Sequence, residues 1–275
     1  MRYVRFPAPR GTGDYIEHGW FVEASGTGEV KREILIPNGR PTVVLSLAGP
    51  GRRHDPLTGA SHPNDNVVFG VTTRPFVLEQ EGDSLHVGAQ LTPWGLAAMV
   101  PGTRLVDEFL PLAEWWGERQ VARLLSRLRE ETGDRSRTDL LCEYLRERIT
   151  PLAAPAVGAL RAAVGAVDEA RGQCAVSELA ERAGIGYQSL YRLFTRHIGV
   201  SPKRYCDILR YYHFAGGLLH EAEGNSAALL ATLHGYYDQA HAARTFKRYT
   251  GISASAFARV HNGIALLMHS GEEKA

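Results

Sequence analysis

Cysteine is scarce in this chain: only Cys142, Cys174 and Cys206 occur among 275 residues. Their odd number and wide spacing exclude a disulfide framework and offer no CxxC pair for metal or redox chemistry. We therefore expect three buried thiols in a reducing compartment.

The chain also lacks any apolar run near the roughly 20 residues that a membrane helix needs. Residues 1–5 (MRYVR) have no apolar centre of a secretory signal. We expect a cytoplasmic protein with no membrane partner.

Catalytic and metal-binding patterns are missing too. No Ser/His/Asp or Cys/His arrangement stands out, and the GTG at 11–13 is not followed by the Lys-Ser/Thr of a phosphate loop. His54, His62 and His86 do not form the tight His-x-His pair of a metal-binding cupin, so we expect them on surface loops. These observations predict no enzyme, no metal and no cofactor.

Charge of neither sign dominates, since the net charge is +1. The balance is uneven, however: residues 155–275 hold 13 Lys/Arg against 10 Asp/Glu (+3), and residues 1–154 hold the other 18 and 20 (−2). A length of 275 residues favours two domains. The more basic half suits a nucleic-acid partner, although charge alone is a weak indicator.

The first part of the chain, about 90 residues, alternates apolar and polar residues between Gly/Pro-rich turns, a pattern typical of a β-barrel or sandwich. Four tryptophans fit either an apolar effector pocket or the core: Trp20, Trp94, Trp115 and Trp116. The predicted strands are 15–23, 32–36, 42–47, 67–71, 76–78 and 85–91.

Helices are predicted after residue 93. Residues 94–100, 118–130 and 138–149 follow the barrel, and the last two are amphipathic, so they either pack on it or pair with a second subunit. Prolines at 151 and 155 interrupt the helical pattern. We therefore predict an α+β chain with a β-rich sensor or dimerisation domain (1–150), a linker (151–155), a helical domain (156–265) and a disordered tail (266–275).

One sequence pattern occurs twice in the predicted helical domain. Arg192, Phe194, Arg196, Gly199 and Ser201 recur 52 positions later as residues 244, 246, 248, 251 and 253. Each copy follows a short helical pattern that ends at a glycine. The repeat predicts two helix-turn-helix units that grip two neighbouring major grooves of DNA.

The first copy has the signals of a complete unit. Ser177 is placed to cap a helix over 178–183, Gly184 suits its C-terminal end, and a second helix covers 187–197. At 100° per residue the second helix turns an apolar arc inward. Its outward arc holds the candidate DNA-binding residues Gln188, Tyr191, Arg192, Thr195 and Arg196. Arginine is the commonest bidentate reader of guanine, and glutamine reads adenine.

The second copy keeps this geometry with fewer polar side chains. We predict helices over 227–234 and 239–249, with Ser226 and Asp238 as caps. The candidate DNA-binding residues are Gln239, Ala240, His241, Arg244 and Lys247. Alanines can meet thymine methyls but donate no hydrogen bond, so we expect mainly phosphate contacts here. A helix over 202–220, about 28 Å long, joins the copies.

The C-terminal 120 residues or so resemble the DNA-binding domain of AraC/XylS-type transcriptional regulators. The resemblance rests on LYRLF at 190–194, GVSP at 199–202, GYYDQ at 235–239 and FKRYTG at 246–251. It implies seven helices, two helix-turn-helix units and a rigid connecting helix. The first part resembles an uncharacterised β-rich domain that precedes such domains, through WFVE at 20–23, IPNG at 36–39 and VGAQLTP at 87–93.

We therefore expect a one-component, effector-responsive regulator that binds double-stranded DNA. In this family an N-terminal barrel senses an effector or dimerises the protein, so a small molecule and a homodimer are further expected partners, with RNA polymerase if the protein is an activator. Two alternatives stay open: a DNA-binding regulator whose barrel only dimerises, and a small-molecule-binding protein or enzyme whose helices are a scaffold.

Overall fold

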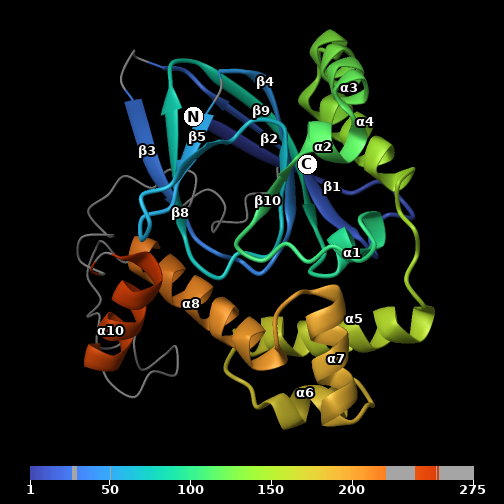
Figure 1. The fold of residues 1–275 in the computed structure, drawn as a ribbon, viewed down its shortest axis with the longest axis vertical. Helices are drawn as coiled ribbons and strands as arrows, with labels where there is room; N and C mark the ends of the chain where they lie inside the picture. The colour runs from blue at the N-terminus through green and yellow to red at the C-terminus, as the bar shows by residue number, and fades with distance from the viewer. Residues whose placement is uncertain (27–29, 50, 221–238, 252, 254–275) are drawn as a thin grey trace.

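The computed structural model describes residues 1–26, 30–49, 51–220, 239–251 and 253. A β-rich part carries helices on one flank, and a helical part lies beneath it (Figure 1). The predicted α+β architecture with a β-rich N-terminal domain is confirmed.

The β-rich part consists of two antiparallel sheets. One has six strands in the order β1-β2-β9-β4-β7-β10, and the other has four in the order β3-β8-β5-β6. The bounds are β1 Arg2–Pro7, β2 Ile16–Ala24, β3 Val30–Leu35, β4 Thr42–Ala48, β5 Gly51–His54, β6 Ser61–Pro63, β7 Val67–Phe69, β8 Phe76–Glu81, β9 Ser84–Leu91 and β10 Phe109–Pro111. All six predicted strands are present, but β1, β5, β6 and β10 were not predicted.

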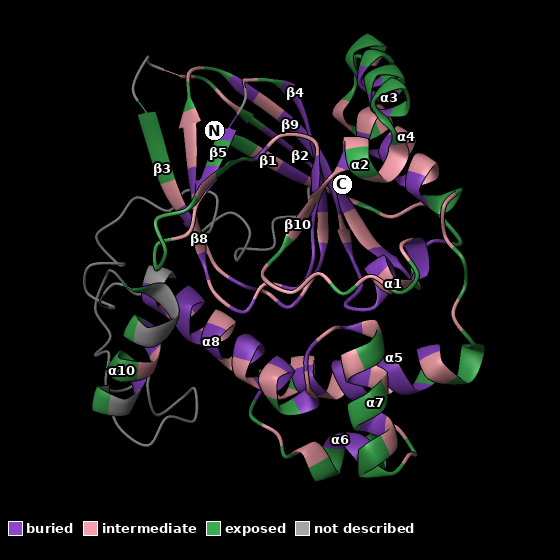
Figure 2. Cartoon of the chain, in the orientation of Figure 1, coloured by how far each residue is buried: buried purple, intermediate pink, exposed green. Residues whose placement is uncertain are grey.

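Four helices flank the six-stranded sheet: α1 Gly95–Met99, α2 Leu112–Trp116, α3 Glu118–Glu130 and α4 Asp134–Arg146. Leu124 and Leu128 of α3 and Leu141 of α4 are buried in one core with Val43 and Val87 of the sheet. Figure 2 shows that buried stripes of α3 and α4 face the sheet while α3 is exposed on its outer side. The two amphipathic helices thus pack on the barrel.

The helical part comprises α5 Ala154–Glu169, α6 Val176–Arg182, α7 Tyr187–His197, α8 Pro202–His220 and α10 Gln239–Thr250. Two sequence predictions are wrong here. Pro155 lies in the first turn of α5, where its missing N–H has no helical partner, so the helix begins inside the predicted 151–155 linker. Ser177 is not a cap, because α6 begins at Val176 and Ala175 precedes it.

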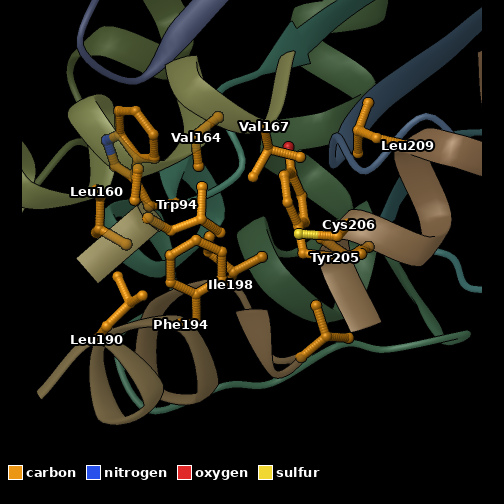
Figure 3. Close-up of a cluster of buried hydrophobic side chains, with 14 of the residues drawn as sticks. Trp94, Leu160, Val164, Val167, Leu190, Phe194, Ile198, Tyr205, Cys206 and Leu209 are labelled. Carbon is orange, nitrogen blue, oxygen red and sulfur yellow. The ribbon is translucent and has the colours of Figure 1, made fainter. Parts of the chain in front are cut away.

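The two parts share one hydrophobic core. Trp94 and Val71 of the β-rich part are buried with Leu160 of α5, Phe194 of α7 and Tyr205 of α8. Figure 3 shows Trp94 beside Leu160 and Val164, with Phe194 and Ile198 close below. The helical part is therefore docked against the barrel. None of the described helices combines the length and the apolar character that crossing a membrane requires.

Candidate functional site

The turn between α6 and α7 is fixed by backbone hydrogen bonds. Gly184 adopts a left-handed φ of +64°, and its N–H donates to Glu181 O at 2.9 Å while Ile185 N–H donates to Ala180 O at 3.1 Å. This paired pattern is a Schellman motif, which ends α6 as predicted for Gly184. At the other end, Glu178 Oε2 accepts the Ala175 N–H at 3.1 Å. The residues of this turn therefore set the direction of α7 relative to α6.

The inner face of α7 packs into the hydrophobic core of the helical part. Leu190 and Phe194 are fully buried, and the Phe194 ring meets Tyr205 of α8 edge-on at 5.8 Å between centroids. Ile198 and Gly199 both donate to Phe194 O, which closes the helix. The apolar arc predicted from the sequence is the buried one.

The outer face of α7 is open at its N-terminal end. Gln188 and Arg192 are exposed, and Tyr191 keeps 46% of its surface exposed. Tyr187, which the sequence prediction omitted, is 58% exposed. Tyr187, Gln188, Tyr191 and Arg192 together line one shallow hollow. In helical projection Tyr187 lies next to the apolar arc. It is the first residue of α7, and its side chain is exposed there. Its position at the start of the helix is the feature of the sequence that could have identified it as a candidate.

The other two candidates on α7 lie differently. Thr195 is half-buried, and its hydroxyl donates back to Tyr191 O at 2.8 Å within the helix. Arg196 is exposed, but it lines a narrow crevice with Arg104 of the β-rich part. The open face therefore consists of the first half of the helix.

The second unit is described through α10. Phe246 is fully buried and its ring lies 5.6 Å from that of Tyr211 in α8, as the repeat predicts. Ala240, Arg244 and Lys247 are exposed. The side chains of Gln239 and His241 lie outside the described residues, as do the predicted 227–234 helix, the Ser226 and Asp238 caps and the 266–275 tail.

Arg40 joins the β-rich part to helices α5 and α8 of the helical part. It lies on the turn between β3 and β4, and its guanidinium donates to both carboxylate oxygens of Asp168 in α5, at 3.1 and 2.6 Å. It also donates to Glu17 Oε1 at 3.0 Å and to the Tyr205 hydroxyl at 3.0 Å. Burial by itself lowers the pKa of Arg40, but Tyr205, Glu17 and Asp168 outweigh it and raise the pKa well above its ordinary value. Arg40 is thus a fully charged anchor between the parts.

Backbone packing supports the same junction. Gly39 has a φ of +74°, and a Cβ there would lie 2.8 Å from the Tyr205 ring and 2.9 Å from Leu209 Cδ2. The close approach of this turn to α8 therefore requires glycine. Gly251 directly follows α10, and a Cβ there would lie 3.3 Å from Leu57 Cδ2, so the β-rich part also lies close to the second unit.

A cavity of about 120 Å³ lies between the two sheets. Its walls come from both of them and include Trp20 of β2, Phe69 of β7, Phe76 of β8 and His86 of β9. Arg40 lines the same cavity and forms the interdomain anchor. The cavity therefore borders the residue that pairs with α5 and α8.

Two sequence expectations about histidine and cysteine need correction. His86 is not on a surface loop: it is buried in β9, with Nδ1 2.9 Å from Ser46 Oγ. Cys174 is half-buried, and its Sγ lies 3.9 Å from Cys206 Sγ, although 32 residues separate them. Of the tryptophans, Trp20 lines the cavity and Trp94 belongs to the interdomain core.

Comparison with known proteins divides the chain in the same way. Residues 179–259 match a helix-turn-helix domain, and residues 5–108 match a domain of unknown function (DUF6597). The lactose operon transcription activator of Staphylococcus xylosus is 31% identical over 85 residues, which are 30% of this chain and 29% of the activator. The chain thus matches under a third of that relative's length.

Solved structures resemble the chain at low identity. ToxT from Vibrio cholerae covers 89% of this chain and 98% of its own, with a TM-score of 0.48 and 9% identity. A regulator with an AraC-type DNA-binding domain from Chromobacterium violaceum covers 38% of this chain and 94% of its own, with a TM-score of 0.35 and 20% identity. The chain carries an AraC-type helix-turn-helix domain at its C-terminal end, behind a β-rich domain of unknown function.

Proposed function

We propose that this protein is a transcription regulator that reads two successive major grooves of DNA with helices 187–197 and 239–249. The observation that carries the proposal is the open face of α7. It presents an amide, a guanidinium and two phenol rings from a helix whose inner face is held in the core by the fully buried Leu190 and Phe194. Such a helix enters a major groove without disturbing the core, and glutamine and arginine can pair with base edges there.

The two helices have different roles in this proposal. The face of α7 reads sequence because it offers side chains that both donate and accept hydrogen bonds. The exposed face of α10 offers Arg244 and Lys247 beside Ala240, so it supplies mainly charge to phosphates. Sequence preference is therefore set chiefly by the first unit.

The test selects a preferred duplex from a random pool and measures affinity for it and for a scrambled duplex. Arg192→Ala should weaken binding to the selected duplex by about 1–3 kcal/mol and leave the scrambled duplex nearly unaffected. Arg119→Ala, an exposed arginine on α3, is the matched control and should change neither. Equal losses on both duplexes would show that Arg192 touches only phosphate.

We further propose that the β-rich part senses a small molecule. The support is the cavity between its sheets, together with Arg40, which lines that cavity and pairs with Asp168 in α5. A ligand that displaces Arg40 would alter the docking of α5 and α8 against the β-rich part. A homodimer, and contact with RNA polymerase if the protein is an activator, stay predictions.

A further inference from the structure

Two of the three cysteines meet beside the first helix-turn-helix unit. Cys174 lies between α5 and α6, Cys206 lies in the first half of α8, and their Sγ atoms are 3.9 Å apart. Cys206 belongs to the interdomain core, next to Tyr205 (Figure 3). A disulfide holds its sulfurs about 2 Å apart, so these atoms need to approach by roughly 1.9 Å. A change of side-chain rotamer moves a sulfur by a distance of this order.

The backbone around Cys174 is already pressed against α8. Arg210 of α8 donates to Gly172 O at 3.1 Å. Gly172 has a φ of +74°, and a Cβ there would lie 2.2 Å from Cys206 O, so the two chain segments are in direct contact. A bond between the thiols would therefore join segments that the fold places side by side, although 32 residues separate them in the sequence.

The two thiols differ in their access to solvent. Cys174 is half-buried, whereas Cys206 is fully buried. Burial raises the pKa of Cys206 to about 12. Burial also raises the pKa of Cys174, although hydrogen bonding to the Cys206 thiol lowers it in part. An oxidant in solution therefore reaches Cys174 first, and Cys206 is placed to react with the product.

We infer that Cys174 and Cys206 are a site of oxidative modification, at which hydrogen peroxide converts the two thiols into an intramolecular disulfide. The Cys174 sulfur attacks one peroxide oxygen and the O–O bond breaks, which gives a sulfenic acid and one water. The Cys206 sulfur then attacks the Cys174 sulfur, the S–O bond breaks, and a second water leaves with the Cys206 proton. The sulfurs lose two electrons in all, and the peroxide gains them.

The bond acts on the first helix-turn-helix unit, a consequence that rests on the proposed DNA-binding function. α6 begins at Val176, two residues after Cys174, so drawing Cys174 toward α8 moves the start of α6. Leu179 of α6 is buried in the same core as Leu190 of α7, so a shift of α6 changes the placement of α7. We therefore expect oxidation to lower the affinity for the selected duplex.

The site is tested by treating the reduced full chain with hydrogen peroxide, removing the oxidant with catalase, and measuring intact and peptide masses. We expect a loss of about 2 Da, a peptide pair joined through Cys174 and Cys206, and one remaining thiol, Cys142. Dithiothreitol should reverse the change. A disulfide that includes Cys142, a sulfinic acid on Cys174 beside a free Cys206 thiol, or no loss of thiols overturns the inference.

Serine variants separate this pair from general oxidation. Cys174→Ser and Cys206→Ser should each form no intramolecular disulfide, and such a bond in either variant would contradict the pairing. Cys142→Ser is the matched control, because Cys142 is buried like Cys206 but lies in α4 and in the other core, and it should form the disulfide as wild type does. The wild-type masses decide the inference even where a variant does not fold.

Affinity for the selected duplex, measured before oxidation, after it and after reduction, tests the effect on the first unit. We expect oxidation to weaken binding by about fivefold or more, with Cys174→Ser unaffected by the same treatment. If the disulfide forms and affinity stays within about twofold, the effect on α7 is wrong and the modification site stands. If the reduced protein binds no DNA, the proposed function and this effect both fail, and the masses alone decide whether the site exists.

Discussion

Removing Arg40 should weaken the junction between the β-rich part and helices α5 and α8 of the helical part. Arg40→Ala deletes a guanidinium that is 13% exposed and removes its bonds to Glu17, Asp168 and Tyr205. The partners then differ in how easily water can replace it. Glu17 keeps the bond from Gln90, and Asp168 is 37% exposed, so both are readily solvated.

The magnitude follows from these differences. Tyr205 is fully buried, so its hydroxyl is left without the Arg40 donor, which costs about 1–2 kcal/mol. The partly exposed ion pairs add about 1 kcal/mol after screening by solvent. We expect Arg40→Ala to lower the free energy of unfolding by about 2–3 kcal/mol and Asp168→Ala by about 1 kcal/mol.

Urea unfolding of the full chain measures both losses. Asp14→Ala is the control, because Asp14 is 55% exposed and pairs across the same junction with the equally accessible Arg161. That change should alter stability by no more than about 0.5 kcal/mol. Equal losses for Arg40→Ala and Asp14→Ala would refute the view that Arg40 anchors the docked domains.

Three further predictions concern other parts of the chain. Lys247→Ala should weaken binding equally on selected and scrambled duplexes and reduce the salt slope by about one, as measured by fluorescence anisotropy. Phe194→Ala should lower the free energy of unfolding by about 3–5 kcal/mol in urea, because the ring is fully buried between α7 and α8. Burial, aided by Arg5 and Arg40, lowers the pKa of His18 to about 4. The unfolded chain therefore binds this proton from about pH 6.5 downward and the folded chain does not, so stability should fall by up to about 3 kcal/mol between pH 7 and pH 4. His18→Gln should remove that part of the decline.

The helices could be predicted well because their patterns are local. The apolar spacing over 118–130 reproduces the bounds of α3, and the Gly184 turn fixes the start of α7. The missed strands are short or lack alternation: β5 reads GRRH and β10 ends in proline. Such strands are determined by pairing with strands that are distant in the sequence, so the local sequence does not reveal them.

The exposed face of α7 could also be predicted, but the junction and the cavity could not. Gln188 and Arg192 follow from helical periodicity alone. Nothing in the local sequence marks Arg40, because its partners Asp168 and Tyr205 lie 128 and 165 residues away. The cavity gathers single residues from several strands and the loops between them, among them Trp20 of β2 and Asn64 between β6 and β7, so no contiguous motif marks it.

The most direct test of the central claim is a salt titration of binding to duplex DNA. If Arg196, Arg244 and Lys247 each neutralise one phosphate, the logarithm of the binding constant should fall linearly with the logarithm of salt concentration, with a slope of about −3. The selected duplex should bind more tightly than the scrambled one at every salt concentration. Affinity that does not change with salt would contradict DNA binding by this chain.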